Sequence, residues 1–278
     1  MQRREFVTMA GLVGLGGATA AVTRAHAAPE TASTMDQIRS SGKLRIAGIP
    51  GQPPGFTKDI TTNEWGGAYF EMARDAAKEL QVELEVVETT WGNTVADLQA
   101  NKIDIAFALS PTPARALAIQ FTSPLYRNPY GILVRKGYEA ATWVDINKEG
   151  VKIAVEQGTS DEAVTRAYAP NATITAIAKH ADAVLSVQSG RNDLMVTSTF
   201  RAMGARQKNP DLDAIFPKPT AFTTVATAIR YDSDWRFREF MEAWIEYNAG
   251  RGAIRNWMLD SLKTIGFTEA DLPEDLEL

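Results

Sequence analysis

The chain has 278 residues, of which 45% are hydrophobic, and its formal net charge at pH 7 is −5. Because polyanions repel an acidic protein, this balance argues against nucleic acids and anionic membrane surfaces as partners. The sequence holds no cysteine and only two histidines, His26 and His180, so we expect neither a disulfide framework nor a zinc site, which needs three or four ligands.

The first 27 residues have the features of a secretory signal. Arg3-Arg4 precedes an apolar stretch from Val7 to Val22, and Ala25-His26-Ala27 is a small-x-small cleavage site. The paired arginines are typical of a twin-arginine signal, with an ordinary Sec signal or a short uncleaved anchor as the alternatives. We therefore predict export with cleavage after Ala27. No later segment approaches the roughly 20 apolar residues that span a bilayer.

Strands and helices alternate in the first half of the chain. Periodicity and breakers predict strands at 43–49, 82–88 and 103–109, and helices at 35–40, 69–80 and 94–101. The run 103–109 is apolar apart from Asp104, as is typical of a parallel strand buried on both faces.

The same alternation restarts in the second half. It predicts strands at 130–135, 151–155, 173–177, 193–197 and 226–230, and helices at 161–169, 181–189 and 233–249. The acidic tail, 269–278, is expected to be solvated. Such alternation indicates parallel sheets covered by helices, an α/β architecture.

Two such units, with a return of the chain after the second, predict two lobes. We expect lobe 1 to comprise 35–126 and 225–278, lobe 2 to comprise 130–221, and the chain to cross between them near 125–130 and 221–225. Because ligands of open parallel sheets bind beyond the carboxyl ends of the strands, the site is expected in the cleft between the lobes.

Several motifs occur together in a characteristic order. They are Lys43-Leu44-Arg45-Ile46, the strand from Ile103 leading to Ser110-Pro111-Thr112-Pro113-Ala114-Arg115, Phe121-Thr122-Ser123-Pro124-Leu125-Tyr126, Val155-Glu156-Gln157-Gly158-Thr159, Gly190-Arg191-Asn192-Asp193 and Asn256-Trp257. In this order the chain resembles the family 3 periplasmic solute-binding proteins, the polar amino-acid receptors of ABC importers, over nearly its whole length after residue 27.

The resemblance implies a two-lobe periplasmic binding protein-like fold (type II) that closes about a hinge. It implies a periplasmic protein that binds a small carboxylate-bearing ligand, an amino acid or a relative, and delivers it to a membrane permease. No catalytic residue, metal or cofactor is expected, and we expect a monomer.

Four positions are expected at the ligand carboxylate. Arg115 follows a strand end and a Thr-Pro helix start, where a guanidinium can hold a carboxylate through two charge-assisted hydrogen bonds. The resemblance places Ser110 on the same carboxylate. Thr159 and Ser160 open a helix whose N–H groups form an anion site, and the resemblance makes them the grip of the second lobe. The alternatives are a surface arginine and ordinary helix caps.

Four further positions are expected to line the cleft. The resemblance implies that the Ala108 carbonyl faces the ligand ammonium and that Trp91 covers one side of the ligand, although a lone tryptophan there also fits a core role. Gln52 and Phe56 belong to the first cleft loop, where the order Pro53-Pro54-Gly55-Phe56 departs from the family pattern.

Ser198 marks a departure from the family, which commonly has an aspartate there to pair with the ligand ammonium. A buried ammonium without its partner costs roughly 3–5 kcal/mol. Either the ligand lacks a normal ammonium, or another carboxylate has taken over. We hypothesise that Glu156 is that partner, with a solvated glutamate at a strand end as the alternative.

The missing aspartate also supports a second function. Cyclohexadienyl dehydratase-like enzymes resemble these receptors, and Glu156 would be a possible general acid in such a site. A sensory protein or a scaffold without transport is the third alternative.

Overall fold

The computed structural model describes residues 32–272, 276 and 278. The predicted signal at residues 1–27 lies outside the described residues. Within the described part of the chain, no helix is both long and apolar enough to cross a membrane.

The first part of the chain alternates as predicted, apart from a short pair of antiparallel strands that was not predicted. Its elements are α1 (Thr34–Ser41), β1 (Lys43–Gly48), β2 (Thr57–Lys58), β3 (Trp65–Gly66), α2 (Ala68–Glu79), β4 (Glu83–Glu88), α3 (Thr94–Gln99), β5 (Ile105–Leu109) and α4 (Pro113–Ala116). Local chemistry sets the ends of α1, because the Ser33 hydroxyl accepts from the Asp36 N–H and Gly42 takes the left-handed conformation that ends the helix.

The second part contains the other predicted strands and helices and several that were not predicted. The elements are β6 (Ile119–Arg135), α5 (Trp143–Ile146), β7 (Lys152–Glu156), α6 (Ser160–Tyr168), β8 (Thr173–Ile177), α7 (His180–Gln188), β9 (Leu194–Ser198), α8 (Thr199–Lys208), β10 (Leu212–Ile215), β11 (Phe222–Arg230), α9 (Arg236–Gly250), α10 (Ala253–Thr264) and η1 (Glu269–Asp271). The short helix η1 begins the tail that was expected to be solvated, and none of its residues is buried.

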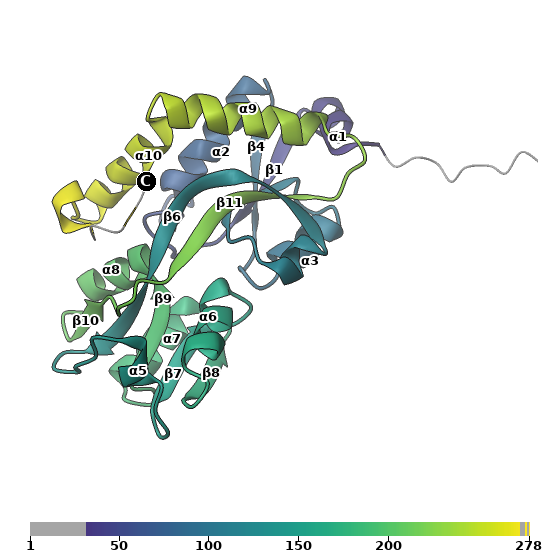
Figure 1. The fold of residues 1–278 in the computed structure, drawn as a ribbon. Coiled ribbons are helices and arrows are strands. Elements are labelled where there is room, and N and C mark those ends of the chain that lie inside the picture. Colours follow the sequence, from purple (N-terminus) through teal and green to yellow (C-terminus); the bar gives the residue numbers. More distant parts are fainter. Residues whose placement is uncertain (1–31, 273–275, 277) are drawn as a thin grey trace, which may run out of the picture. The chain divides into compact units, whose positions relative to one another are not determined.

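The long strand β6 is the main difference from the sequence prediction, which placed a strand only at 130–135. Its first part pairs antiparallel with β11 (Figure 1). The register shifts where Tyr126 pairs with Val225 and Pro124 with Ala226. A proline is tolerated in a strand at such an irregularity, which explains how β6 continues through residues that read as breakers.

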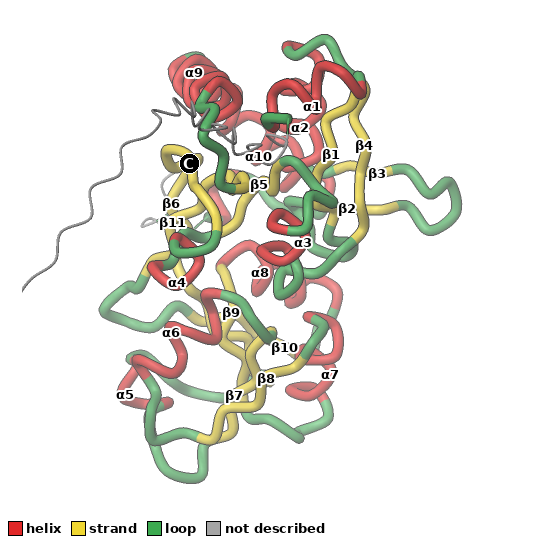
Figure 2. Tube along the Cα trace, turned by 90° about the vertical axis from the view of Figure 1, so that its right-hand side faces the viewer, coloured by secondary structure: helices red, strands yellow, loops and turns green. Residues whose placement is uncertain are grey.

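The strands form two parallel groups joined by β6 and β11. The strand order is β4-β1-β5-β11-β6-β9-β7-β8, and β10 pairs with β6. β1 is parallel to β4 and β5, and β7 is parallel to β8 and β9. Figure 2 shows the two groups as separate sets of yellow strands. The predicted parallel α/β units are thus confirmed.

Each group of strands has its own buried side chains. One large cluster includes Ile46 and Phe107, whose ring meets Trp244 of α9 edge-on at a centroid distance of 6.0 Å. Two smaller clusters surround the other group, one around Ile153 and one around Leu133. Separate cores beside each sheet are what a two-lobe protein requires, since each lobe must bury its own apolar surface.

Candidate functional site

A polar cavity lies where the carboxyl ends of both groups of parallel strands meet the paired strands β6 and β11. Its volume is about 60 Å³, several times the about 10–15 Å³ that one water molecule needs. The side chains that line it come from the loops or helix starts after β1, β4, β5, β7 and β9, from β6 and β11, and from α2. This position agrees with the expected cleft between the lobes.

Eight of the ten residues expected at the site line this cavity. They are Gln52, Trp91, Ala108, Ser110, Arg115, Thr159, Ser160 and Ser198. Phe56 and Glu156 are not among the lining residues. Phe56 is fully buried, with its ring edge-on to those of Trp65 and Tyr69. It is therefore a core residue beneath the first cleft loop, and its expected place in the cavity is wrong.

Arg115 spans the two groups of strands. Its Nη1 donates to the Ser110 carbonyl at 2.7 Å, and its Nη2 donates to the Gly158 carbonyl at 2.9 Å. Ser110 follows β5 and Gly158 follows β7, so one guanidinium joins the loops of both lobes. Burial lowers the pKa of Arg115, and the nearby charge of Asp161 opposes that change. An arginine remains charged in such surroundings and has further N–H groups for a ligand.

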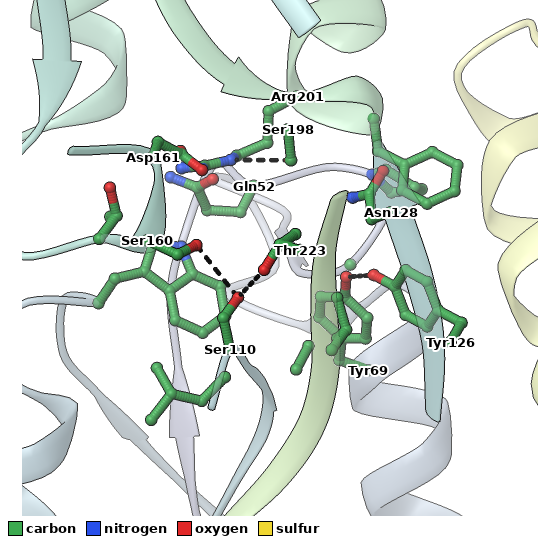
Figure 3. A pocket seen from close by; sticks show the side chains of 18 of the residues that line it. Gln52, Tyr69, Ser110, Tyr126, Asn128, Ser160, Asp161, Ser198, Arg201 and Thr223 are labelled. Carbon is green, nitrogen blue, oxygen red and sulfur yellow. Dashed lines mark hydrogen bonds and ion pairs between the residues drawn. The ribbon is translucent and has the colours of Figure 1, made fainter. Parts of the chain in front are cut away.

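Three hydroxyl groups meet beside this arginine. Ser160 Oγ donates to Ser110 Oγ at 3.2 Å, and Thr223 Oγ1 donates to the same atom at 2.6 Å (Figure 3). Because the Ser110 hydroxyl accepts both bonds, its own proton remains available to donate. Together with Arg115, this hydroxyl cluster (Ser110, Ser160 and Thr223) makes a corner of the cavity rich in hydrogen-bond donors.

The backbone on both sides of this corner is shaped for the site. Ala108 has φ +62°, a left-handed conformation that a non-glycine residue rarely adopts and that often accompanies function. On the other side, the Thr159 hydroxyl donates to the Glu156 carbonyl at 2.7 Å and caps α6 by accepting from the Glu162 N–H. The amino end of α6 is therefore held against the cavity, where its N–H groups favour an anion.

A second charged group occupies the opposite corner. The guanidinium of Arg201, in the first turn of α8, forms ion pairs with Glu156, at 2.5 Å, and with Asp161. Its Nε donates to Ser198 Oγ at 3.2 Å. Asp161 and Arg201 line the cavity, whereas Glu156 is 3% exposed and reaches Arg201 from outside the lining.

This placement changes the interpretation of Glu156. The alternative of a solvated glutamate is wrong, because the side chain is buried and paired. Its hypothesised direct contact with a ligand amino group is not supported, because Glu156 is not among the residues that line the cavity. Burial raises the pKa of Glu156 and of Asp161, and the charge of Arg201 opposes that rise in both.

Two buried side-chain oxygens that face the cavity have no hydrogen-bond partner. Gln52 Oε1 and Asn128 Oδ1 belong to side chains that are 5% and 3% exposed. Figure 3 shows Gln52 on the side of Asp161 and Arg201, and Asn128 on the opposite wall. Because a buried acceptor without a donor is costly, both oxygens favour a ligand that brings N–H or O–H groups.

The remaining wall is aromatic. Trp91 is 9% exposed and lines the cavity, as expected. Tyr69 and Tyr126 form a hydrogen bond between their hydroxyl groups, and burial raises the pKa of Tyr69 to about 12. Burial also raises the pKa of Tyr126, so both phenols stay neutral at ordinary pH.

The cavity lining also includes residues that were not predicted from the sequence, among them Asp161, Arg201, Asn128, Tyr69 and Thr223. Asp161 directly follows Ser160, and Arg201 lies three residues after Ser198. Both lie in the first turn of a helix that begins at a predicted strand end. This position after a strand end is the sequence feature that could have identified them. Among the described residues, no group of three or more histidine, cysteine, aspartate or glutamate side chains could hold a metal ion.

The fold and this cleft define a two-lobe α/β binding protein of the periplasmic type. Residues 44–265 match the model of the bacterial extracellular solute-binding proteins, family 3. The match covers more than half of the chain, so the protein belongs to this family.

Proteins similar to this chain include an enzyme and a binding protein. The chain is 27% identical over 229 residues to the cyclohexadienyl dehydratase of Pseudomonas aeruginosa, covering 81% of this chain and 85% of the enzyme. An ancestral amino acid-binding protein described as a precursor of cyclohexadienyl dehydratase is 29% identical, with a TM-score of 0.73 over 81% of this chain and 97% of that one.

A solved receptor has a similar structure. An amino acid ABC transporter substrate-binding protein of Streptococcus pneumoniae, bound to L-arginine, is 25% identical, with a TM-score of 0.76. The similarity covers 82% of this chain and 98% of that protein.

Proposed function

We propose that this protein binds a small carboxylate-bearing ligand, an amino acid or a close relative, in the cavity between its lobes. The observation that carries the proposal is the donor-rich corner, where Arg115 and Ser110 from one lobe meet Ser160 from the other. A carboxylate held there gains hydrogen bonds from both lobes only when they are close together. A ligand that binds one conformation more tightly shifts the protein toward it, so carboxylate binding favours closure.

The proposed lobes are those expected from the sequence, 35–126 with 225–278 and 130–221. The proposed hinge lies near 125–130 and 221–225, where β6 and β11 pair with each other. One feature refines these boundaries. Phe200 and Met203 of α8 belong to the buried cluster of the first lobe, so α8 packs against both lobes.

We further propose that the protein is the periplasmic component of an ABC importer. Its membership of the family and its similarity to an amino acid ABC transporter substrate-binding protein support this role. In this proposal residues 1–27 direct export, a twin-arginine signal being our preferred route. The mature protein is a monomer that delivers its ligand to a membrane permease.

The test is a thermal-shift screen followed by calorimetry on the purified protein. The ligands are amino acids, their deaminated carboxylates, opines, polyamines and prephenate. A ligand that binds only the folded state raises stability by about 2.7 kcal/mol at a hundredfold excess over Kd. We expect a shift with an amino acid or a related carboxylate, and recovery of that ligand unchanged. No shift with any carboxylate would contradict the proposal.

The site assignment is tested with Arg115→Gln, and Arg74→Gln is the matched control on an exposed ion pair with Glu71. Removing one partner of a buried charge pair costs about 2–5 kcal/mol. We therefore expect Arg115→Gln to weaken binding of every carboxylate by about thirtyfold or more, and Arg74→Gln to leave it unchanged. Equal affinities in the two variants would remove Arg115 from the site.

A dehydratase-like enzyme is the second candidate. The relationship to cyclohexadienyl dehydratase favours it, and so does a cleft carboxyl group, that of Asp161, whose pKa is raised by burial. The ion pair with Arg201 works against a proton-donating role, because it stabilises the charged carboxylate. Consumption of prephenate in the same screen would replace the receptor proposal with this one.

A further inference from the structure

We infer that the Asp161 carboxylate receives the amino group of the ligand, and that the ligand is a zwitterion with a single carboxylate held at Arg115. This inference rests on the function proposed above. It assigns to Asp161 the role that the sequence left open between Ser198 and Glu156.

The two corners of the cavity have opposite charge. Arg115 brings one positive charge to the donor-rich corner, beside the hydroxyl cluster. At the other corner, one guanidinium, that of Arg201, faces two carboxylates, those of Glu156 and Asp161. With all three groups ionised, that corner has a net charge of −1. A ligand with a carboxylate at one end and an ammonium at the other matches this arrangement.

Asp161 is the acidic side chain at this corner that can contact the amino group of the ligand. It lies in the first turn of α6, next to Ser160 of the hydroxyl cluster, and lines the cavity. Its charge acts on the pKa of Arg115 as well as on that of Arg201, so it lies near both cations. Glu156 lies outside the lining and can act only through Arg201. The Ser198 hydroxyl already accepts from Arg201 Nε.

One unpartnered oxygen at this corner points to the same ligand group independently of charge. Gln52 Oε1, on the side of Asp161 and Arg201, is a buried acceptor in the cavity wall and lacks a donor (Figure 3). An ammonium has three N–H donors and no acceptor, so it can satisfy Asp161 and a neutral oxygen at once. A carboxylate at this corner would instead face acceptors and be repelled.

A second carboxylate on the ligand has no free cation to bind. Arg115 and Arg201 are the positively charged side chains in the described lining of the cavity. Arg201 uses Nε on Ser198, Nη1 on Glu156 and Nη2 on Asp161. The cavity is therefore built for one carboxylate and one amino group, which disfavours dicarboxylates such as prephenate.

The experiment measures selectivity for the amino group. Each of the twenty standard L-amino acids is screened by thermal shift. The one with the largest shift is then titrated by calorimetry beside the carboxylic acid of the same skeleton that lacks the amino group. The proteins are the wild type, Asp161→Asn, and Asp182→Asn as the matched control, an exposed aspartate in the first turn of α7.

We expect the wild type and Asp182→Asn to prefer the amino acid. Asp161→Asn should lose about a hundredfold in affinity for it, as for other truncated charge pairs. Its affinity for the deaminated acid should stay within about threefold or increase, because a negative charge has left the cavity. An equal loss for both ligands, or a wild type that prefers the deaminated acid, would overturn the inference and leave the receptor function standing. A wild type that binds neither class would instead overturn the proposed function.

Folding is checked by the melting temperature without ligand. Should Asp161→Asn fail to fold, Asp161→Glu takes its place, because it keeps a carboxylate for Arg201 and moves it by one methylene. We expect this variant to lose amino-acid affinity by about tenfold or more and to keep its affinity for the deaminated acid. Unchanged affinity for the amino acid in Asp161→Glu would count against the inference.

Discussion

Gly92 and Gly158 approach each other backbone to backbone, so that a side-chain carbon placed on Gly158 would stand 3.0 Å from the Gly92 Cα atom. Gly92 follows β4 and Gly158 follows β7, and the contact therefore joins loops of the two lobes. Gly158 has φ +73°, which also favours glycine. This approach brings the Gly158 carbonyl to Arg115, so the donor-rich corner depends on it.

We predict that Gly92→Val weakens ligand binding without unfolding either lobe. A Cβ at Gly92 would stand 3.3 Å from the Gln157 carbonyl oxygen. Because φ at Gly92 lies outside the left-handed region, the substitution tests steric overlap without adding backbone strain. Overpacking of this kind costs about 1–3 kcal/mol, or about five- to 150-fold in affinity. Calorimetry and the melting temperature of the free protein measure the two effects.

Gly250→Val is the matched control, since nothing lies within 4 Å of its Cβ position and its φ is not left-handed. It should bind ligand as the wild type does. A Gly92→Val variant with wild-type affinity would show that ligand binding does not require this close approach.

The parts of the fold that could be predicted are those whose pattern is local. β5 is a continuous apolar run because the sheet is covered on both faces. β1 begins with alternating charged and apolar residues, and Gly42 marks the end of α1. The first half of β6 could not be predicted, because Pro124 and Pro129 read as breakers. Only pairing with β11 makes that segment a strand. α8 was missed because small and polar residues leave it without a clear apolar face.

The same distinction holds within the site. Ser110 and Arg115 could be placed because they follow one strand within a short motif. Asp161, Glu156 and Arg201 could not be grouped from the sequence. The ion pairs that join them connect residues 40 and 45 positions apart. Glu156 ends β7, whereas Asp161 and Arg201 lie in the first turns of helices that follow different strands. Which of the two carboxylates faces the cavity depends on packing that no spacing rule reveals.

We predict that His180 makes the protein less stable in mild acid. Its Nδ1 is buried without a partner, and burial, with Arg201 and Lys208 nearby, lowers its pKa from 6.5 to about 3. As the pH falls below 6.5, His180 takes up a proton in the unfolded chain but stays neutral in the folded protein. The free energy of unfolding therefore falls by up to about 1.4 kcal/mol per pH unit between pH 6.5 and 3.

Denaturant unfolding at pH 7 and pH 5 measures this effect, with His180→Gln as the reference. Glu156 and Asp161 have raised pKa values and change stability in the opposite direction near their own pKa, but they contribute equally to both proteins. The loss between pH 7 and pH 5 should therefore be larger in the wild type. Identical losses would show that His180 takes up its proton normally in the folded protein.

We predict that Thr223 supports the ligand only through Ser110. Thr223 Oγ1 donates to Ser110 Oγ at 2.6 Å, which leaves the Ser110 proton to the ligand. Ser110→Ala removes a hydrogen bond to a charged group, worth about 1.5–3 kcal/mol, whereas Thr223→Val removes a neutral one, worth about 0.5–1.5 kcal/mol. Calorimetry should therefore show a greater loss of affinity in Ser110→Ala than in Thr223→Val.

A double variant tests whether Thr223 acts on the ligand through Ser110. If Thr223 acts by orienting Ser110, then Ser110→Ala/Thr223→Val binds no more weakly than Ser110→Ala alone, because nothing remains to be oriented. Thr175→Val, on an exposed position of β8, should leave affinity unchanged and controls for the loss of a hydroxyl group. Losses that simply add in the double variant would mean that Thr223 contacts the ligand itself, and the hydroxyl cluster would then offer two independent donors rather than one oriented donor.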